Sequence, residues 1–360
     1  MRVLVERRKY LSEEDLVELN ALCQALPGPT STQTLSAIGY RLGGPNLAYL
    51  TLLIWILPAI ALMTLAAFLI TALQGNVSFN FTHFVPAMAV GFVSYAAYSM
   101  ATKSVTTRVG LVLMVVAAVT SYFIRNPVFY PAALIAAGLI TAFKYKEQPR
   151  AEKTPIHVSW ANFFLWGGVL IAAAVLGHFT DYRPVRLFEN FYRNGSLVFG
   201  GGQVLTPLLY TEFVELKDYL DAKQFLSGYA IAQSLPGPVF SFSSYIGALS
   251  MQKTGAGVGE QLLGAWMAAA GIFLPGTFLI FFLIRFWDSL KKYRAVRAAL
   301  EGVTAASSGL VAAAAVFLFQ PLDNSPMNYA FTIGTFVLLT FTRIPAGAII
   351  AIGLLLGLVI

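Results

Sequence analysis

Long uncharged, apolar runs alternate along this chain with short charged segments. No Asp, Glu, Lys or Arg occurs within residues 42–102, 154–180, 194–211, 224–252, 261–284 and 302–322. Shorter runs of the same kind occupy residues 109–124, 126–143, 324–342 and 344–360. A helix needs about 20 apolar residues to cross a bilayer. The pattern therefore predicts an all-α polytopic membrane protein, placed in the cell (inner) membrane by several passes through the bilayer.

The same pattern, read with its proline and glycine interruptions, predicts the order of the helices. An amphipathic helix and a short helix ending near Arg41 come first. A polar, proline-containing segment, KYKEQPRAEKTP, marks the midpoint. We expect a first repeat at 1–143, a cytoplasmic linker at 144–157 and a second repeat at 158–360. Further helices are expected at about 46–74, 82–101, 108–124, 127–143, 158–180, 190–211, 220–235, 239–251, 257–286, 296–319, 328–342 and 344–360.

One motif occurs in both halves. Gln-x-Leu-Pro-Gly-Pro is found at residues 24–29 and again at 233–238. Aligning the two copies also aligns Tyr10 with Tyr219 and Ala21 with Ala230, and WILPAIAL around Pro58 resembles IFLPGTFL around Pro275. The chain is therefore predicted to be an internal repeat in which each half is one structural unit.

Basic residues between the apolar runs predict the orientation of the halves. The linker, Lys103 with Arg108, and the cluster at 285–297 are expected to be cytoplasmic, with GNVSFNFTH and QPLDNSPMN outside. The long helix after the first motif then runs outward and its counterpart inward. Repeats of opposite orientation are typical of secondary transporters.

Composition narrows the classes of function. The chain is 57% hydrophobic and 11% charged, where a soluble domain has roughly 25% charged residues. The net charge of +7 lies in short segments between helices, which favours membrane flanks over a nucleic-acid partner. One cysteine and three scattered histidines favour neither a disulfide nor a metal site. No catalytic constellation or nucleotide loop is found, so we expect no enzyme and no cofactor.

The repeated Pro-Gly-Pro predicts a broken helix with polar residues after the break. Proline ends one helix and suits the first position of the next. Free backbone N–H groups at a helix start favour an anion, and within a membrane they need protein or a wet cavity. A simple kink is the alternative, but it would need one proline and no polar residues. The polar residues are Thr30, Ser31, Thr32, Gln33, Thr34 and Ser36 after the first break, and Ser241, Ser243 and Ser244 after the second.

A third candidate element is NGSLVFGGGQVLTPLL, in which Gly200, Gly201 and Gly202 permit close backbone approach and Gln203 adds an amide. Glycines in membrane helices often serve tight packing. Beside a twice-repeated helix break, we favour a binding role for these glycines.

These segments carry a family resemblance. CQALPGPTSTQ, FGGGQVLTPLL and FLSGYAIAQSLPGPVFSF resemble motifs of the chromate ion transporter family, through both halves of the chain. The resemblance implies export of chromate, with sulfate as the look-alike dianion, and hence chromate resistance. In that family a helix with a Phe-Gly-Gly motif normally precedes the segment that begins here at Val5. The predicted binding residues are Gln24, Pro27, Gly28, Pro29, Thr30, Ser31, Gly200, Gly201, Gly202, Gln203, Gln233, Pro236, Gly237, Pro238 and Ser241.

Charged residues near the motifs could serve in transport or could lie at solvated helix ends and the membrane interface. Glu212, Glu215 and Glu260 are candidates for a proton relay, although solvated helix ends explain them as well. Arg41, Arg193 and Lys217 are candidates for drawing an anion inward or for cations at the membrane interface.

The expected function is secondary export of chromate or sulfate. The alternatives are import or exchange of another inorganic oxyanion or a small organic anion, and a non-transporting membrane scaffold. The expected partners are the anion and the lipid bilayer, with no nucleic acid. The sequence leaves the preferred anion, a coupling ion and a homo-oligomer open.

Overall fold

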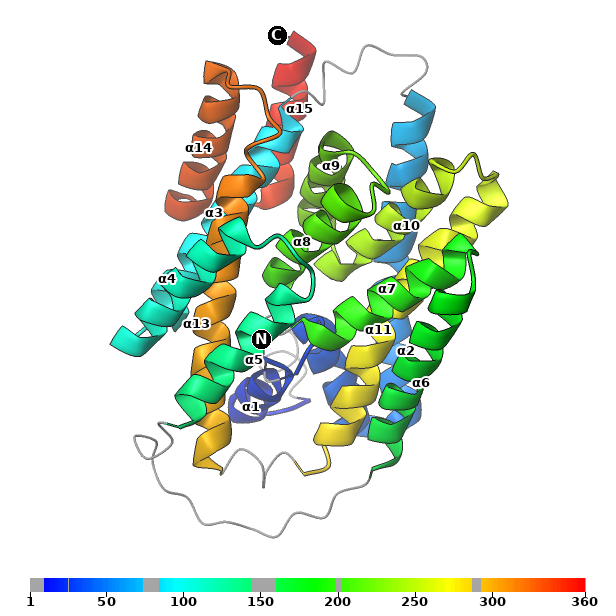
Figure 1. Cartoon of the computed structure of the whole chain (residues 1–360), viewed down its shortest axis with the longest axis vertical. Coiled ribbons are helices and arrows are strands. Elements are labelled where there is room, and N and C mark those ends of the chain that lie inside the picture. Colours follow the sequence, from blue (N-terminus) through cyan, green and yellow to red (C-terminus); the bar gives the residue numbers. More distant parts are fainter. Residues whose placement is uncertain are drawn as a thin grey trace.

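A computed structural model describes residues 10–24, 26–73, 84–143, 160–198, 202–286 and 293–359. These residues form helices and connecting turns, with no strand among them, which confirms the all-α prediction (Figure 1). The helices, in chain order, are α1 Glu13–Gln24, α2 Thr30–Leu73, α3 Val85–Ser104, α4 Arg108–Phe123, α5 Phe129–Ala142, α6 Ala161–Phe179, α7 Arg183–Leu197, α8 Gly202–Tyr210, η4 Thr211–Leu216, α9 Ala222–Ser234, η5 Val239–Ser241, α10 Phe242–Gln252, α11 Val258–Leu283, α13 Arg294–Phe317, α14 Pro326–Phe341 and α15 Ala346–Val359.

Four of the described helices are long and apolar enough to cross a membrane. They are Thr30–Ala72 within α2, and α6, α11 and α13. The shorter apolar helices α4, α5, α14 and α15 accompany them. Large apolar side chains on α6, among them Phe164, Ile171 and Leu176, are exposed, as expected of a helix that faces lipid.

A kink divides α2 into a short and a long part. Gly43 and Gly44 have non-helical backbone angles, with φ of 71° at Gly44, and Pro45 follows. Glycine tolerates positive φ and proline cannot continue the preceding hydrogen-bond pattern, so these residues bend the chain. The short helix that the sequence predicts, ending near Arg41, is therefore the part of α2 before this kink.

Corresponding helices of the two halves run in opposite directions. In Figure 1, α2 rises from the bottom of the view to the top while α11 descends, and α3 descends while α13 rises. Inverted repeats require this arrangement. The side of the membrane that each end faces stays a prediction.

Small residues bring helices of the centre close together. A Cβ atom at Gly247 of α10 would lie 2.3 Å from the carbonyl oxygen of Gly264 in α11. One at Gly195 of α7 would lie 2.8 Å from the carbonyl oxygen of Ile272. Such contacts between helix backbones are typical of membrane proteins. They hold α10 and α11 at the centre, directly beside the motif segments.

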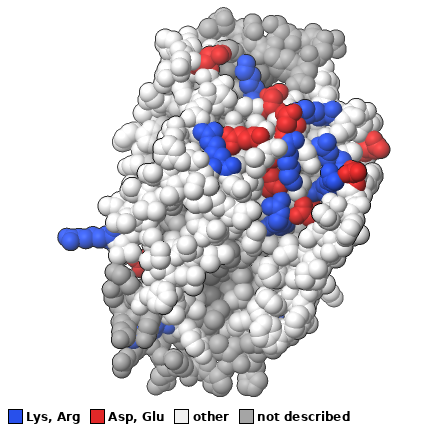
Figure 2. Space-filling model, in the orientation of Figure 1, with Lys and Arg blue, Asp and Glu red and all other residues white. Residues whose placement is uncertain are grey.

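Charged side chains are concentrated on one part of the surface. On the face in Figure 2, most visible residues are uncharged, and Lys, Arg, Asp and Glu gather together toward the upper right of the view. Acidic and basic residues are intermixed there, which indicates ion pairing more than a surface of one sign.

Candidate anion-binding site at two helix breaks

The first Pro-Gly-Pro forms a buried break between α1 and α2. Gly28 has φ of +114°, which L side chains rarely adopt, and Pro29 immediately precedes α2. The Gly28 N–H donates a hydrogen bond to the Val198 carbonyl at 2.9 Å. The Gln33 amide Nε2 donates to the carbonyls of Pro27 at 2.7 Å and Gly276 at 3.4 Å. Hydrogen bonds from three parts of the chain thus fasten this break.

The second Pro-Gly-Pro forms a break between α9 and α10. Gly237 has φ of +137°, and a single 3₁₀ turn, η5, follows before α10 begins. The Ser241 hydroxyl donates to the Pro238 carbonyl at 2.8 Å. Pro238 is buried and Pro236 is exposed. Both copies of the motif therefore break a helix, as their sequence predicts.

Each break packs against the long helix of the other half. A Cβ atom at Gly28 would lie 3.4 Å from the Cα atom of Gly276, the residue after Pro275 of α11. A Cβ atom at Gly237 would lie 2.6 Å from the Cβ atom of Ala59, the residue after Pro58 of α2. The contact is therefore reciprocal: each break packs on the residue that follows the repeated leucine-proline pair in the long helix of the other half.

The glycine segment links the two breaks. Val198, at the end of α7, accepts the bond from Gly28, and a Cβ atom at Gly202, the first residue of α8, would lie 3.3 Å from the Phe240 ring. Gly200 and Gly201 lie outside the described residues. Four residues of extended chain span at most about 14 Å. Both breaks therefore contact the ends of one short segment.

Several hydroxyls after the breaks are already bonded to backbone. Thr34 donates to the Thr30 carbonyl at 2.8 Å, and Ser244 donates to the Ser241 carbonyl at 2.8 Å. With Ser241, these residues lack the free donor that the sequence hypothesis assigned to them. Among the polar residues that follow the breaks, four buried atoms have no hydrogen-bond partner in the described part of the chain: Thr32 Oγ1, Gln33 Oε1, Ser36 Oγ and Ser243 Oγ.

The remaining candidates differ in exposure. Thr30 is half-buried and Ser31 is exposed at the start of α2, while Gln24 ends α1 and its side chain is outside the described part. The Gln233 amide donates to the Tyr229 hydroxyl at 2.7 Å, and that hydroxyl donates to Gln203 at 3.2 Å. Tyr229 was missed from sequence, although its spacing of four residues from Gln233 places the two on one helix face.

The predicted cations and carboxylates are paired with one another. Arg193 and Lys217 contact the Glu212 carboxylate at 2.6 and 3.0 Å. Glu215 contacts Arg125 at 2.6 Å, whereas Glu260 is exposed in the first turn of α11.

At the other predicted cation, Arg41 contacts Asp15 at 2.9 Å, and hydrogen bonds from Ser12 lower the pKa of that aspartate. Among the described residues, no three His, Cys, Asp or Glu side chains group as they would around a metal ion.

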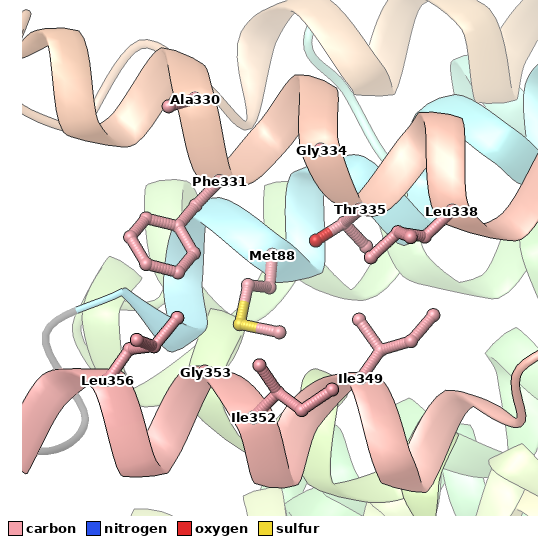
Figure 3. A pocket seen from close by; sticks show the side chains of 10 residues that line it. All are labelled: Met88, Ala330, Phe331, Gly334, Thr335, Leu338, Ile349, Ile352, Gly353 and Leu356. Atoms are coloured by element: carbon pink, nitrogen blue, oxygen red, sulfur yellow. The ribbon is translucent and has the colours of Figure 1, made fainter.

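An apolar groove lies away from the breaks. It encloses about 230 Å³ between α14, α15 and α3. Figure 3 shows Met88, Phe331, Ile349 and Ile352 pointing into it, with Thr335 as a polar side chain on its wall. Without a charged residue in its lining, this groove offers nothing to an inorganic dianion, and the breaks remain the candidate site.

The fold defines the class of this protein as a helical, multi-pass membrane protein with paired broken helices. The chromate transporter family model matches residues 1–142 and 185–358, and the chain belongs to that family. The stretch between the two matches contains the predicted linker and α6.

Curated relatives resemble nearly the whole chain. A chromate transport protein of Cupriavidus metallidurans is 28% identical over 99% of this chain and 86% of its own length. A probable chromate transport protein of Synechococcus elongatus is also 28% identical, over 99% of this chain and 88% of its own. An uncharacterized transporter of Methanocaldococcus jannaschii is 24% identical over 99% and 88%. No solved structure matches this chain.

Proposed function

We propose that this protein is a secondary transporter that exports chromate, or the related sulfate dianion, from the cytoplasm and thereby confers chromate resistance. Membership of the chromate transporter family and the names of its curated relatives support chromate as the substrate. The observation that carries the proposal is the meeting of the motifs, in which Val198 bonds to the first break and Gly202 packs on the residues after the second.

The proposed binding site is the glycine segment together with the two breaks. Starts of helices supply N–H donors and a partial positive charge without a fixed opposite ion, which suits a dianion that must also be released. Thr32 and Ser243 add buried hydroxyls without partners in the described residues. The proposed site residues are those of the two Pro-Gly-Pro motifs and the glycine segment, with the amides of Gln203 and Gln233 beside them.

Alternating access in this proposal is a movement of one half against the other. Each break contacts the other half's long helix, so a rocking motion changes the surroundings of both breaks together. When a dianion leaves a cell that is negative inside by about 100 mV, its electrical free energy falls by about 4.6 kcal/mol, at 2.3 kcal/mol per charge. Export of the dianion is therefore downhill in this electrical field and needs no coupled ion.

Transport assays test this function. Cells that carry the full chain are loaded with chromate, and everted vesicles are given chromate outside, each with and without excess sulfate. We expect faster loss from the cells and uptake into the vesicles, both inhibited by sulfate. Asp323→Asn, an exposed change away from the motifs, serves as the matched control with unchanged transport. Net accumulation of chromate by intact cells, or no movement in either assay, would contradict export.

A further inference from the structure

A cluster of charged and amide side chains lies one helical turn before Val198, the residue that binds the first break. It is built around Glu212 of η4 and its partners Asn190, Arg193 and Asn194 of α7 and Lys217 just after η4. The Val198 N–H bonds to the Asn194 carbonyl, which places the cluster one turn before the residue that binds Gly28.

Three nitrogen groups converge on the Glu212 carboxylate. The Arg193 guanidinium, the Lys217 ammonium and the Asn194 amide all donate to the Glu212 carboxylate, the last at 2.8 Å. Both cations also donate to the Asn190 side-chain oxygen. The Asn190 Nδ2 is buried and has no hydrogen-bond partner in the described part of the chain. Cationic donors of this kind form the strong, charge-assisted hydrogen bonds that bind oxyanions.

The cluster combines a buried carboxylate with reachable cations. The Glu212 side chain is 1% exposed, whereas those of Arg193 and Lys217 are each 30% exposed. Glu189 contacts the Arg193 Nε at 3.0 Å, and this pair does not depend on the position of Glu212. Anions from solution can therefore compete with one carboxylate, Glu212, for these cations.

The backbone around Glu212 is suited to movement. Residues Thr211–Leu216 form a π-helix, in which the Lys217 N–H bonds to the Glu212 carbonyl five residues earlier. Single π-turns are rare and often occur at functional sites. Conversion of this wider turn to a regular α-helical turn would change the direction of the Glu212 side chain.

We propose that Arg193, Lys217, Asn190 and Asn194 form a second binding site for the oxyanion, which the Glu212 carboxylate occupies in this structure in place of the substrate. This inference rests on the proposed function, since the ligand is the same dianion. An anion passing between the two helix breaks and the membrane surface would displace the Glu212 carboxylate from the cluster. When the anion leaves, Glu212 would return to its place.

The test is Glu212→Gln in the purified full chain, with thermal unfolding measured in sodium sulfate, chromate and chloride at equal ionic strength. Lys217 then lacks its carboxylate and Arg193 keeps only Glu189, so we expect sulfate and chromate, but not chloride, to raise the Tm far more than in the native chain. The matched control is Glu215→Gln, which also removes a carboxylate paired at 2.6 Å. We expect it to lower the Tm without this specific response to dianions.

Transport kinetics give a second measurement. Without the competing carboxylate, we expect the KM for chromate to fall at least about fivefold in Glu212→Gln. Lys217→Met removes the ammonium, which pairs with Glu212 and lies 6.0 and 5.9 Å from the ring centroids of Phe213 and Tyr219, and we expect it to raise KM by a similar factor and to lower the Tm. Because Arg193 and Asn194 still bind Glu212 in this variant, it keeps the test available if Glu212→Gln does not fold.

The outcomes separate this inference from the proposed function. A Glu212→Gln chain whose Tm responds to dianions no more than Glu215→Gln, or a Lys217→Met chain with unchanged KM, would overturn the second site while native transport stands. A native chain that neither binds nor moves either dianion would overturn the function. In that case the response of the Glu212→Gln Tm to sulfate would still report on the cluster.

Discussion

The two helix breaks share one motif and are fastened in different ways. Hydrogen bonds from Gly28 and Gln33 hold the first break, which is buried throughout. At the second, Gly237 packs closely against Ala59, the Ser241 hydroxyl bonds to the Pro238 carbonyl and the Ser244 hydroxyl reaches the Ile60 carbonyl of α2 at 3.3 Å, while Pro236 is exposed. By the spacing of the repeat, Phe242 stands where the first half has Gln33. One backbone shape can therefore be stabilised by a buried amide in one half and by serine hydroxyls with close packing in the other.

The largest difference between the breaks is expected for glycine substitutions. Gly237→Ala combines an unfavourable φ with a Cβ atom 2.6 Å from that of Ala59, and we expect the free energy of unfolding to fall by about 3 kcal/mol. A Cβ atom at Gly28 would meet Gln33 Nε2 at 3.0 Å and the Gly276 Cα atom at 3.4 Å, both farther than the contact at Gly237, so we expect Gly28→Ala to lose less, about 1–2 kcal/mol. Thermal unfolding in detergent measures both losses.

Two further variants sharpen this glycine comparison. Ala59→Gly in the Gly237→Ala background removes the overlap but not the strain, and we expect it to restore about half of the loss. Gly168→Ala in α6, where a Cβ atom meets nothing within 4 Å, is the control without loss. Equal losses at Gly28 and Gly237 would show that the two breaks are held alike.

The next largest effect is expected from removing the side-chain hydrogen bond that stabilises the first break. Gln33→Leu leaves the Pro27 carbonyl without its side-chain donor at a buried position, and we expect a loss of about 1–3 kcal/mol of stability together with slower chromate transport. Gln261→Leu removes an amide that donates to the Ala256 carbonyl at 2.8 Å far from the break, and it is the matched control. Transport that survives Gln33→Leu at the native rate would remove Gln33 from the mechanism.

The smallest effects distinguish the two serines that follow the breaks. Ser241→Ala removes a buried bond to the Pro238 carbonyl, and we expect it to cost about 1 kcal/mol of stability. Ser31 is exposed, so Ser31→Ala should leave stability unchanged while raising the KM for chromate about fivefold, the equivalent of one hydrogen bond. Unfolding curves and uptake rates on the same preparations separate these effects, and a destabilised Ser31→Ala would contradict this assignment.

Much of the fold could be predicted because it depends on local pattern. Uncharged runs located most of the helices to within a few residues, and Pro-Gly-Pro predicted both breaks, at residues 27–29 and 236–238. The helix expected at 190–211 was wrong, because α7 begins at Arg183 and ends at Leu197, before α8. The repeat also pointed to the prolines of the long helices, since Pro58 and Pro275 occupy matching places. The reciprocal packing of breaks and prolines could not be predicted, because it depends on contacts between residues far apart in the chain.

The candidate site was less predictable than the fold. Hydroxyls after a break can bond either to an anion or to their own helix, and composition does not distinguish the two: Ser241 and Ser244 bond to the backbone. Gln33 was grouped with these hydroxyls although it bridges to α11, and the repeat gave no hint, because its counterpart is Phe242. Side-chain direction and partners across the molecule decide such roles.

The reciprocal contact between each break and the other half has a consequence for how the protein is made. Gly28 leaves the ribosome well before its hydrogen-bond partner Val198 and its packing partner Gly276, which lie far later in the sequence. The helices of the first half therefore enter the membrane before their own break has its permanent neighbours. The binding region reaches its final form only when synthesis has passed α11, and a nascent chain stopped earlier carries the motif without the surroundings that shape it.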